Sequence, residues 1–170
     1  MAYNTKRIAL IGILGALTVI SLILAIILPT GKLSFYCLSS FFISIIIIEY
    51  RVTAGWLFFF TTNLLAYVVI PDKVAIIPYT AFFSIYGIVK YYAEMIKNTV
   101  LEFTIKYAFF NACLVLALFL ADKLFTGVNK LSYPLAAIII ILQVVFFIYD
   151  YVYTMVINYY KYRLRNFLVK

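Results

Sequence analysis

The residues of this chain that could do chemistry inside a membrane are neutral amides. Asn63 lies eight residues before Pro71, and Gln143 lies nine residues after Pro134. If these segments are helical, each amide is ~12–13 Å below the surface at which its proline lies. Asn111 falls near the middle of another apolar run. A buried amide both donates and accepts hydrogen bonds, so it could recognise a neutral, planar solute or bond to a neighbouring helix; both interpretations are open.

Tyrosines add aromatic rings and hydroxyl groups at a similar expected depth. Five of them would fall in the outer half of the membrane or in its loops: Tyr36, Tyr67, Tyr79, Tyr86 and Tyr133. There they could stack on a solute or hydrogen-bond to it, or they could belong to the usual interfacial belt of aromatic residues. Because no acid or histidine would lie beside them, we expect the solute to be neutral or weakly charged. The predicted ligand-binding residues are Asn63, Gln143, Tyr36, Tyr67, Tyr79 and Tyr133.

The groups that enzymes and metal sites need are missing from the sequence. The chain has no histidine, and Cys37 and Cys113 lie far apart within apolar runs, where we expect buried thiols and no disulfide. We find no motif for a serine nucleophile and no phosphate-binding loop. The sequence therefore predicts no catalytic activity, no bound metal and no cofactor.

The six acidic residues can all be placed near a membrane surface. Asp150 is the deepest, because it follows Pro134 by ~24 Å of helix, which reaches the inner interface. There it could pair with a basic residue such as Arg51 or Lys106. Proton- and ion-coupled pumps keep ionisable groups at the membrane centre. This chain therefore lacks the usual means of energising transport by itself.

The elements that would position these residues are membrane-spanning helices. The chain is 67% hydrophobic, which excludes a soluble domain with a polar surface. Its apolar runs do not alternate as the strands of a membrane β-barrel do. We therefore predict an all-α integral membrane protein, a single domain (1–170) of six transmembrane helices in a compact bundle. The spans are predicted at 8–28, 33–48, 52–70, 74–89, 107–121 and 134–158, with a polar segment at 90–106 that is either a charged surface helix or a solvated connector.

The distribution of basic residues predicts the orientation. Six spans place both termini on one side, and cytoplasmic segments of membrane proteins are enriched in Lys and Arg. With both termini cytoplasmic, ten of the 14 basic residues lie inside and four outside, which predicts a multi-pass membrane protein in this orientation. The net charge of +8 then reflects these segments and contact with anionic lipid, and no nucleic-acid partner is expected. The four outer residues are Lys32, Lys73, Lys123 and Lys130.

Small residues gather on one part of the first predicted helix. Ala9, Gly12, Gly15 and Ala16 lie on adjoining parts of one face. Small side chains let helix backbones approach closely, and packing of this kind drives helix association in lipid. The face could pack inside the six-helix bundle, or it could bind a separate membrane protein.

The chain resembles the substrate-binding S component of an energy-coupling factor (ECF) transporter for vitamins and other micronutrients. The resemblance rests on its size, its six spans, the small-residue face at Ala9, Gly12 and Ala16, the stretch 28–34 (LPTGKLS) and the opening of the third span at 52–56 (VTAGW). In the family, two alanines four residues apart are usual on that face, and here glycine replaces the first. The resemblance implies capture of a micronutrient from outside, a membrane coupling protein that docks on the first helix, and two cytoplasmic ATPases that drive the cycle.

A membrane scaffold is the competing class. The rod-shape protein MreD is similar in size and span number, works by binding partners and needs no polar cavity. Amides at mid-depth favour the solute binder, whereas an outer half filled tightly by Phe and Ile would favour the scaffold. The sequence does not name the solute.

Overall fold

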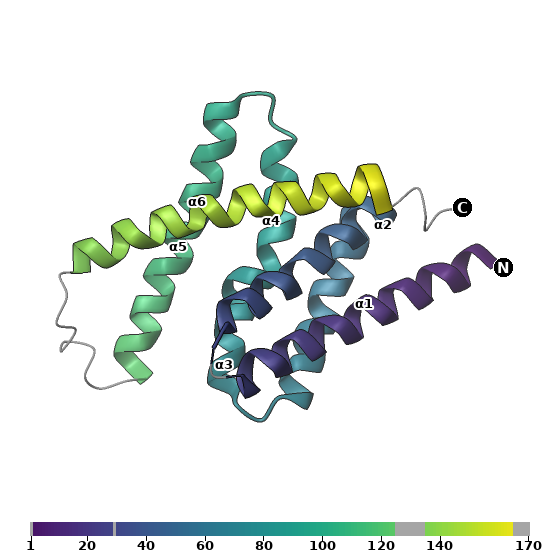
Figure 1. Ribbon diagram of the computed structural model, residues 1–170, viewed down its shortest axis with the longest axis horizontal. Coiled ribbons are helices and arrows are strands. Elements are labelled where there is room, and N and C mark those ends of the chain that lie inside the picture. Colours follow the sequence, from purple (N-terminus) through teal and green to yellow (C-terminus); the bar gives the residue numbers. More distant parts are fainter. Residues whose placement is uncertain (1, 29, 125–134, 165–170) are drawn as a thin grey trace. The chain divides into compact units, whose positions relative to one another are not determined.

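The computed structural model describes residues 2–28, 30–124 and 135–164, and their regular structure is helical (Figure 1). Five segments in these ranges are long and apolar enough to cross a membrane, so the protein is an all-helical membrane protein. The α-helices are α1 (Ala2–Ile27), α2 (Lys32–Val69), α3 (Lys73–Pro78), α4 (Ser84–Glu94), α5 (Thr99–Leu124) and α6 (Leu135–Tyr159). Two π-helical segments, η1 (Tyr79–Phe83) and η3 (Tyr160–Leu164), join α3 to α4 and continue α6.

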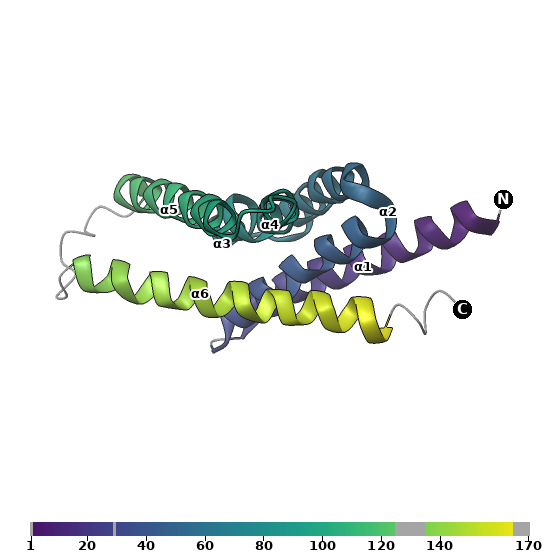
Figure 2. The same cartoon turned by 90° about the horizontal axis from the view of Figure 1, so that it is seen from above.

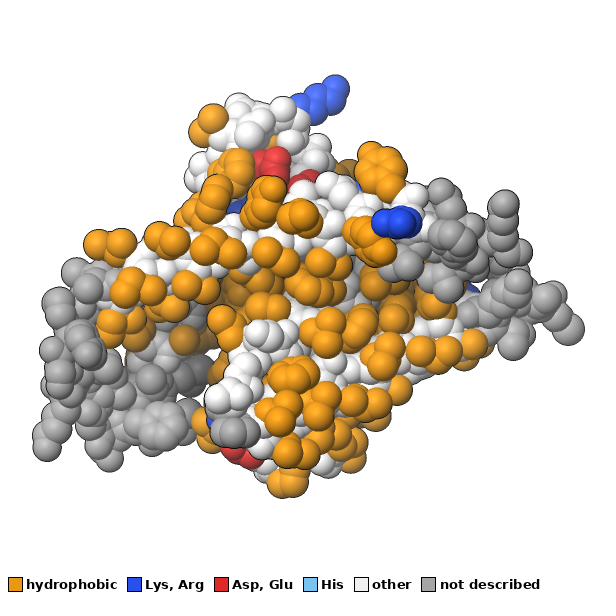
Figure 3. Space-filling model, viewed as in Figure 1, with side chains coloured by type: hydrophobic (Ala, Val, Ile, Leu, Met, Phe, Trp, Pro, Cys, Tyr) orange, Lys and Arg blue, Asp and Glu red, His pale blue; other side chains and the backbone are white. Residues whose placement is uncertain are grey.

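The chain forms two compact units, Met1–Glu102 and Phe103–Lys170. The first contains α1 to α4, and the second contains most of α5 together with α6. Hydrophobic side chains cover much of the face shown in Figure 3, as expected for a surface that lies in lipid. Each unit is described separately below.

The helices predicted at 33–48 and 52–70 correspond to the two halves of α2, which ends at Val69 and is broken near its middle. Tyr50 (φ −130°, ψ 15°) and Arg51 (φ 71°, ψ 169°) have non-helical backbone angles, and the chain changes direction there (Figure 2). An unbroken helix of 38 residues would be ~57 Å long, nearly twice the ~30 Å hydrocarbon core. The break therefore falls between the two predicted spans.

The two halves of α2 pack closely beside the break. Gly55 has no side chain, and a Cβ there would lie 2.5 Å from Ile47 Cγ1. Further along, Leu14 from α1 and Ile88 from α4 join a buried cluster with residues from both halves of α2. The other members of this cluster are Ile43, Ile46, Ile47, Ala54, Phe58 and Phe59. Side-chain packing of this kind is the force that holds helices together in lipid.

The first unit has two ends that differ in their residues. At one end, which we call the Asp72 end, the Tyr36 hydroxyl donates to the Ala75 carbonyl (2.7 Å), and Asp72 caps α3 by accepting from two backbone N–H groups. At the other, the Arg51 end, the Arg7 guanidinium lies over the Tyr50 ring, 5.0 Å from its centroid. The chain therefore runs back and forth between these ends.

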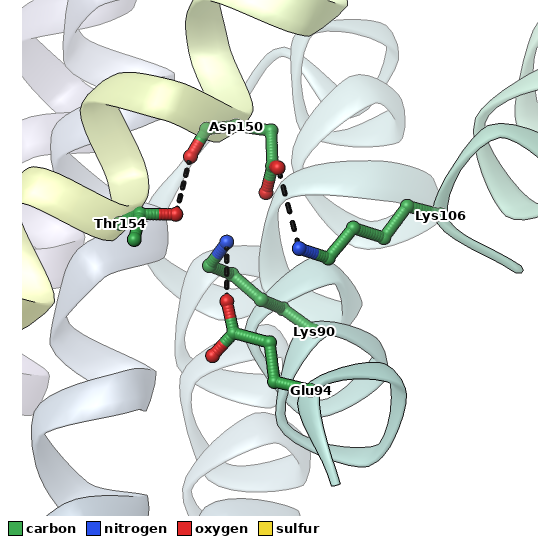
Figure 4. A network of polar contacts seen from close by, with 5 residues as sticks. All are labelled: Lys90, Glu94, Lys106, Asp150 and Thr154. Atoms are coloured by element: carbon green, nitrogen blue, oxygen red, sulfur yellow. Dashed lines mark hydrogen bonds and ion pairs between the residues drawn. The ribbon is translucent and has the colours of Figure 1, made fainter. Parts of the chain in front are cut away.

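In the second unit, α5 and α6 are joined by side chains. Phe110 stacks on Phe146 with ring centroids 4.4 Å apart. Lys106 Nζ lies 3.3 Å from Asp150 Oδ2, which confirms Lys106 as the partner of Asp150 (Figure 4). Thr154 donates to the Asp150 carbonyl at 2.9 Å.

The polar segment predicted at 90–106 is not a separate surface helix. Lys90 lies within α4 and forms an ion pair with Glu94 (2.8 Å), and α5 begins at Thr99, before the predicted start at 107. Asn98 explains the early start, because its side chain accepts from the Val100 N–H (3.0 Å) as capping residues do. The connection between α4 and α5 is therefore short.

Candidate functional site

Asn63 is the centre of a buried polar cluster in the first unit. It projects from the second half of α2 and is 8% exposed. Its amide nitrogen donates to the Phe59 carbonyl (2.8 Å) and to Ser84 Oγ (3.3 Å), and its amide oxygen accepts from Thr80 Oγ1 (2.7 Å). The cluster therefore links α2 to η1 and α4.

Tyr79 and Thr62 extend this cluster. Tyr79 is 1% exposed, and its hydroxyl donates to Thr62 Oγ1 at 3.0 Å. Thr62 donates in turn to the Phe58 carbonyl (2.8 Å), and Ser84 donates to the Thr80 carbonyl (3.1 Å). A buried hydroxyl without a partner would be costly in lipid, so these bonds are what allows a polar cluster at this depth.

The local fold that presents these side chains is a π-helical turn after Pro78. Pro78 has no backbone N–H and cannot make the usual hydrogen bond to the preceding turn. In η1 the Ser84 N–H donates to the Tyr79 carbonyl five residues earlier, which adds one residue to the turn. Single π-helical turns inside α-helices are rare and often occur at functional sites. Here the turn carries Tyr79 and Thr80, which both contact α2.

The chemistry available to this cluster is neutral hydrogen bonding. An amide offers two donors and two acceptor positions, and Asn63 uses three of these four within the protein. The remaining acceptor position is on its carbonyl oxygen. No acid or base belongs to the cluster. Within the described residues there is also no group of three or more His, Cys, Asp or Glu side chains that could hold a metal ion.

The other residues of the predicted ligand set have different surroundings. Tyr36 is partly buried and stacks on Phe83, with ring centroids 5.5 Å apart. Tyr67 is 44% exposed. Gln143 belongs to the second unit, where it donates to the Asn111 amide oxygen (2.8 Å). Tyr133 lies outside the described residues.

The structure therefore brings together part of the predicted set. Asn63 and Tyr79 belong to one polar cluster. Asn63 and Gln143 each form a hydrogen bond to a neighbouring helix. Ligand binding by these residues stays a prediction. Thr62, Thr80 and Ser84 were not predicted as site residues. The signal in the sequence was the i, i+4 spacing of Thr80 and Ser84 in an apolar segment.

The small-residue face of α1 is divided by the fold. Gly15 is buried, and a Cβ there would lie 3.8 Å from Phe58 Cε2. Ala9, Gly12 and Ala16 are exposed, and a Cβ on Gly12 would meet no atom within 4 Å. Gly15 therefore packs inside the first unit, and the other three residues form an open strip along the helix, which we call the α1 strip.

Comparison of the chain with protein-family models, curated proteins and solved structures finds no match.

Proposed function

We propose that the protein is the substrate-binding subunit of an ECF-type importer in a bacterial cell membrane. The observation that carries this proposal is the α1 strip, in which Gly12 has open space around it although the adjacent Gly15 packs against Phe58. A strip without bulky side chains on a membrane helix allows a second helix to approach closely. In this proposal a membrane coupling protein docks on the strip.

The chain is proposed to cross the membrane six times, with α2 crossing twice. The break at Tyr50 and Arg51 supports this, because each half of α2 is ~27 Å long, which is close to the thickness of the hydrocarbon core. The Arg51 end of the first unit then lies on the cytoplasmic side with both termini. The Asp72 end lies outside, as the distribution of basic residues predicts.

The solute is proposed to bind near the Asn63 cluster and to enter from the Asp72 end. Thr80 lies eight residues after Asp72, or ~12 Å along the helix, and Asn63 lies a similar distance before Pro71. Hydroxyl and amide groups would bind a small neutral or weakly charged micronutrient, with Tyr36 and Tyr67 of the same unit as further contacts. ATP hydrolysis belongs to two cytoplasmic ATPases, which act through the coupling protein.

The hydrogen bonds that Asn63 makes to other residues of the protein favour the alternative, a scaffold protein of the MreD type. Such a protein would use its polar groups only to hold helices together.

Mass spectrometry of small molecules that co-purify with the protein from its own cells separates the two proposals. The importer subunit carries one enriched polar metabolite, and Asn63→Ala reduces its recovery in protein that still folds. A well-folded preparation that carries no metabolite, even after incubation with a cell extract, contradicts the importer proposal and favours the scaffold.

A further inference from the structure

Arg51 has a backbone conformation that normally requires glycine. Its φ of 71° and ψ of 169° lie in a region that is nearly restricted to glycine, and among the described residues it is the one non-glycine residue with positive φ. At the loop between α1 and α2 the positive φ of 82° belongs to Gly31. Residues held in such conformations concentrate at ligand clamps and active sites. An arginine here therefore suggests a use for its side chain.

Arg7 supplies a second guanidinium at the same end of the first unit. Its Cζ lies 5.0 Å from the centroid of the Tyr50 ring, which places it beside the residue that precedes Arg51. Arg51 is exposed and Arg7 partly exposed. Neither side chain makes a hydrogen bond or ion pair with another described residue. Glu49 is the adjacent acid, so two positive charges stand against one negative charge at this turn.

From this arrangement we propose that Arg51 and Arg7 bind the phosphate of an anionic phospholipid headgroup at the Arg51 end. The guanidinium group is planar and presents paired N–H donors that match phosphate oxygens. Arg7 begins the first apolar span, and Arg51 lies between the two halves of α2, so both belong at a membrane surface where headgroups lie. The bound phosphate offsets the strain at Arg51 by satisfying its guanidinium. This inference does not depend on the proposed transport function.

The test compares the unfolding temperature of the purified protein in phosphatidylcholine nanodiscs with and without phosphatidylglycerol. For the unmodified protein we expect phosphatidylglycerol to raise the unfolding temperature. Arg51→Gly removes the charge and also relieves the strain, so its unfolding temperature in phosphatidylcholine is equal or higher, while the rise with phosphatidylglycerol falls at least twofold. Lys97→Gln is the matched control, because it removes one charge from the exposed turn between α4 and α5 and keeps the full rise.

Two further variants and a soluble probe complete the test. Arg51→Gln and Arg7→Gln also reduce the rise with phosphatidylglycerol, which keeps the proposal testable if Arg51→Gly does not fold. The soluble probe is millimolar glycerol phosphate, added to the protein in phosphatidylcholine nanodiscs. If it raises the unfolding temperature of the unmodified protein but not that of Arg51→Gln, the phosphate site is supported, and its ligand is a soluble anion. An equal loss in Lys97→Gln, or a full rise in both Arg51 variants, overturns the proposal.

Discussion

Ile47 and Gly55 lie in contact across the break in α2, and a Cβ on Gly55 would come within 2.5 Å of Ile47 Cγ1. Ile47 is 4% exposed and belongs to the buried cluster of the first unit, so it has little room to move. The missing side chain at position 55 is therefore what lets the two halves of α2 approach each other. This contact fixes the direction in which the second half leaves the turn, and Thr62 and Asn63 lie on that half.

Gly55→Ala is expected to destabilise the protein. The added methyl group overlaps Ile47 near its Cγ1 and Cδ1 atoms and forces the two halves of α2 apart, which lowers the unfolding free energy by about 1–3 kcal/mol. The better helix propensity of alanine offsets up to about 1 kcal/mol of this loss. Thermal unfolding in detergent measures the change. Gly12→Ala is the control, because its Cβ enters open space. Equal unfolding temperatures for the two variants would contradict the role given to Gly55.

Asp150→Asn is expected to lower the unfolding free energy by about 3–5 kcal/mol, because it removes the carboxylate that lies 3.3 Å from the buried Lys106 ammonium. The Lys106 side chain is 2% exposed and that of Asp150 is 10% exposed. Replacing both residues at once, with Lys106→Met and Asp150→Leu, is expected to restore most of the loss, since apolar residues of similar size often substitute for a buried ion pair. Chemical denaturation compares the three proteins. A double variant no more stable than Asp150→Asn would show that the pair is not the cause.

Solute binding is expected to depend on Asn63 and to be insensitive to pH between 6 and 8. Asn63→Ala removes a hydrogen-bonding group worth about 1–3 kcal/mol when a buried partner is left unsatisfied, so the affinity for the co-purifying metabolite falls by roughly tenfold or more. The chain has no histidine, the side chain that usually changes charge between pH 6 and 8. Isothermal titration at pH 6 and 8 measures both effects. Thr61→Ala, which changes an exposed hydroxyl on the same half of α2, is the control. A tenfold change in affinity between the two pH values would count against the site.

The proposed topology, six crossings with both termini inside, predicts a pattern of thiol labelling in intact cells. After Cys37 and Cys113 are replaced by alanine, single cysteines at Lys32, Asp72 and Asn129 are expected to react with an impermeant reagent. Single cysteines at Arg51 and Lys97 are expected to react only after the cells are opened. Labelling of the cysteine at Arg51 together with that at Asp72 would mean that the second half of α2, which lies between these two positions, does not cross the membrane.

The helical membrane class and the approximate helix positions could be predicted from the sequence, because long apolar runs in lipid must satisfy their own backbone hydrogen bonds. The pairing of Asp150 with Lys106 could also be predicted from the sequence, since a buried acid needs a basic residue close enough to pair with it. The apolar runs on either side of Tyr50 and Arg51 predict an interruption at these residues, but they do not predict its backbone geometry. Nothing in the residue type of Arg51 indicates positive φ, which is unusual for a non-glycine residue.

The polar cluster around Asn63 shows what sequence reasoning could not supply. Depth could be counted from helix rise, so Asn63 was identified as a mid-depth amide. Its partners Thr80 and Ser84 depend on the helix that lies opposite and on the π-helical turn after Pro78, and both follow from tertiary packing. The division of the α1 face, with Gly15 inside and Gly12 exposed, has the same origin.

The central claim, that the α1 strip binds the membrane subunit of an ATP-driven importer, is tested most directly by affinity purification of the protein and of Gly12→Leu from its own cells in mild detergent. We expect the unmodified protein to bring down one membrane protein and two ATPases. Gly12→Leu is expected to lose all three while it keeps its unfolding temperature and its bound metabolite, because the leucine side chain enters open space in the isolated protein and blocks close helix approach. Gly15→Leu, whose side chain would extend beyond a Cβ that already lies 3.8 Å from Phe58 Cε2, is expected instead to lower the unfolding temperature. Recovery of the same three partners with Gly12→Leu, or of no ATPase with the unmodified protein, would contradict the account.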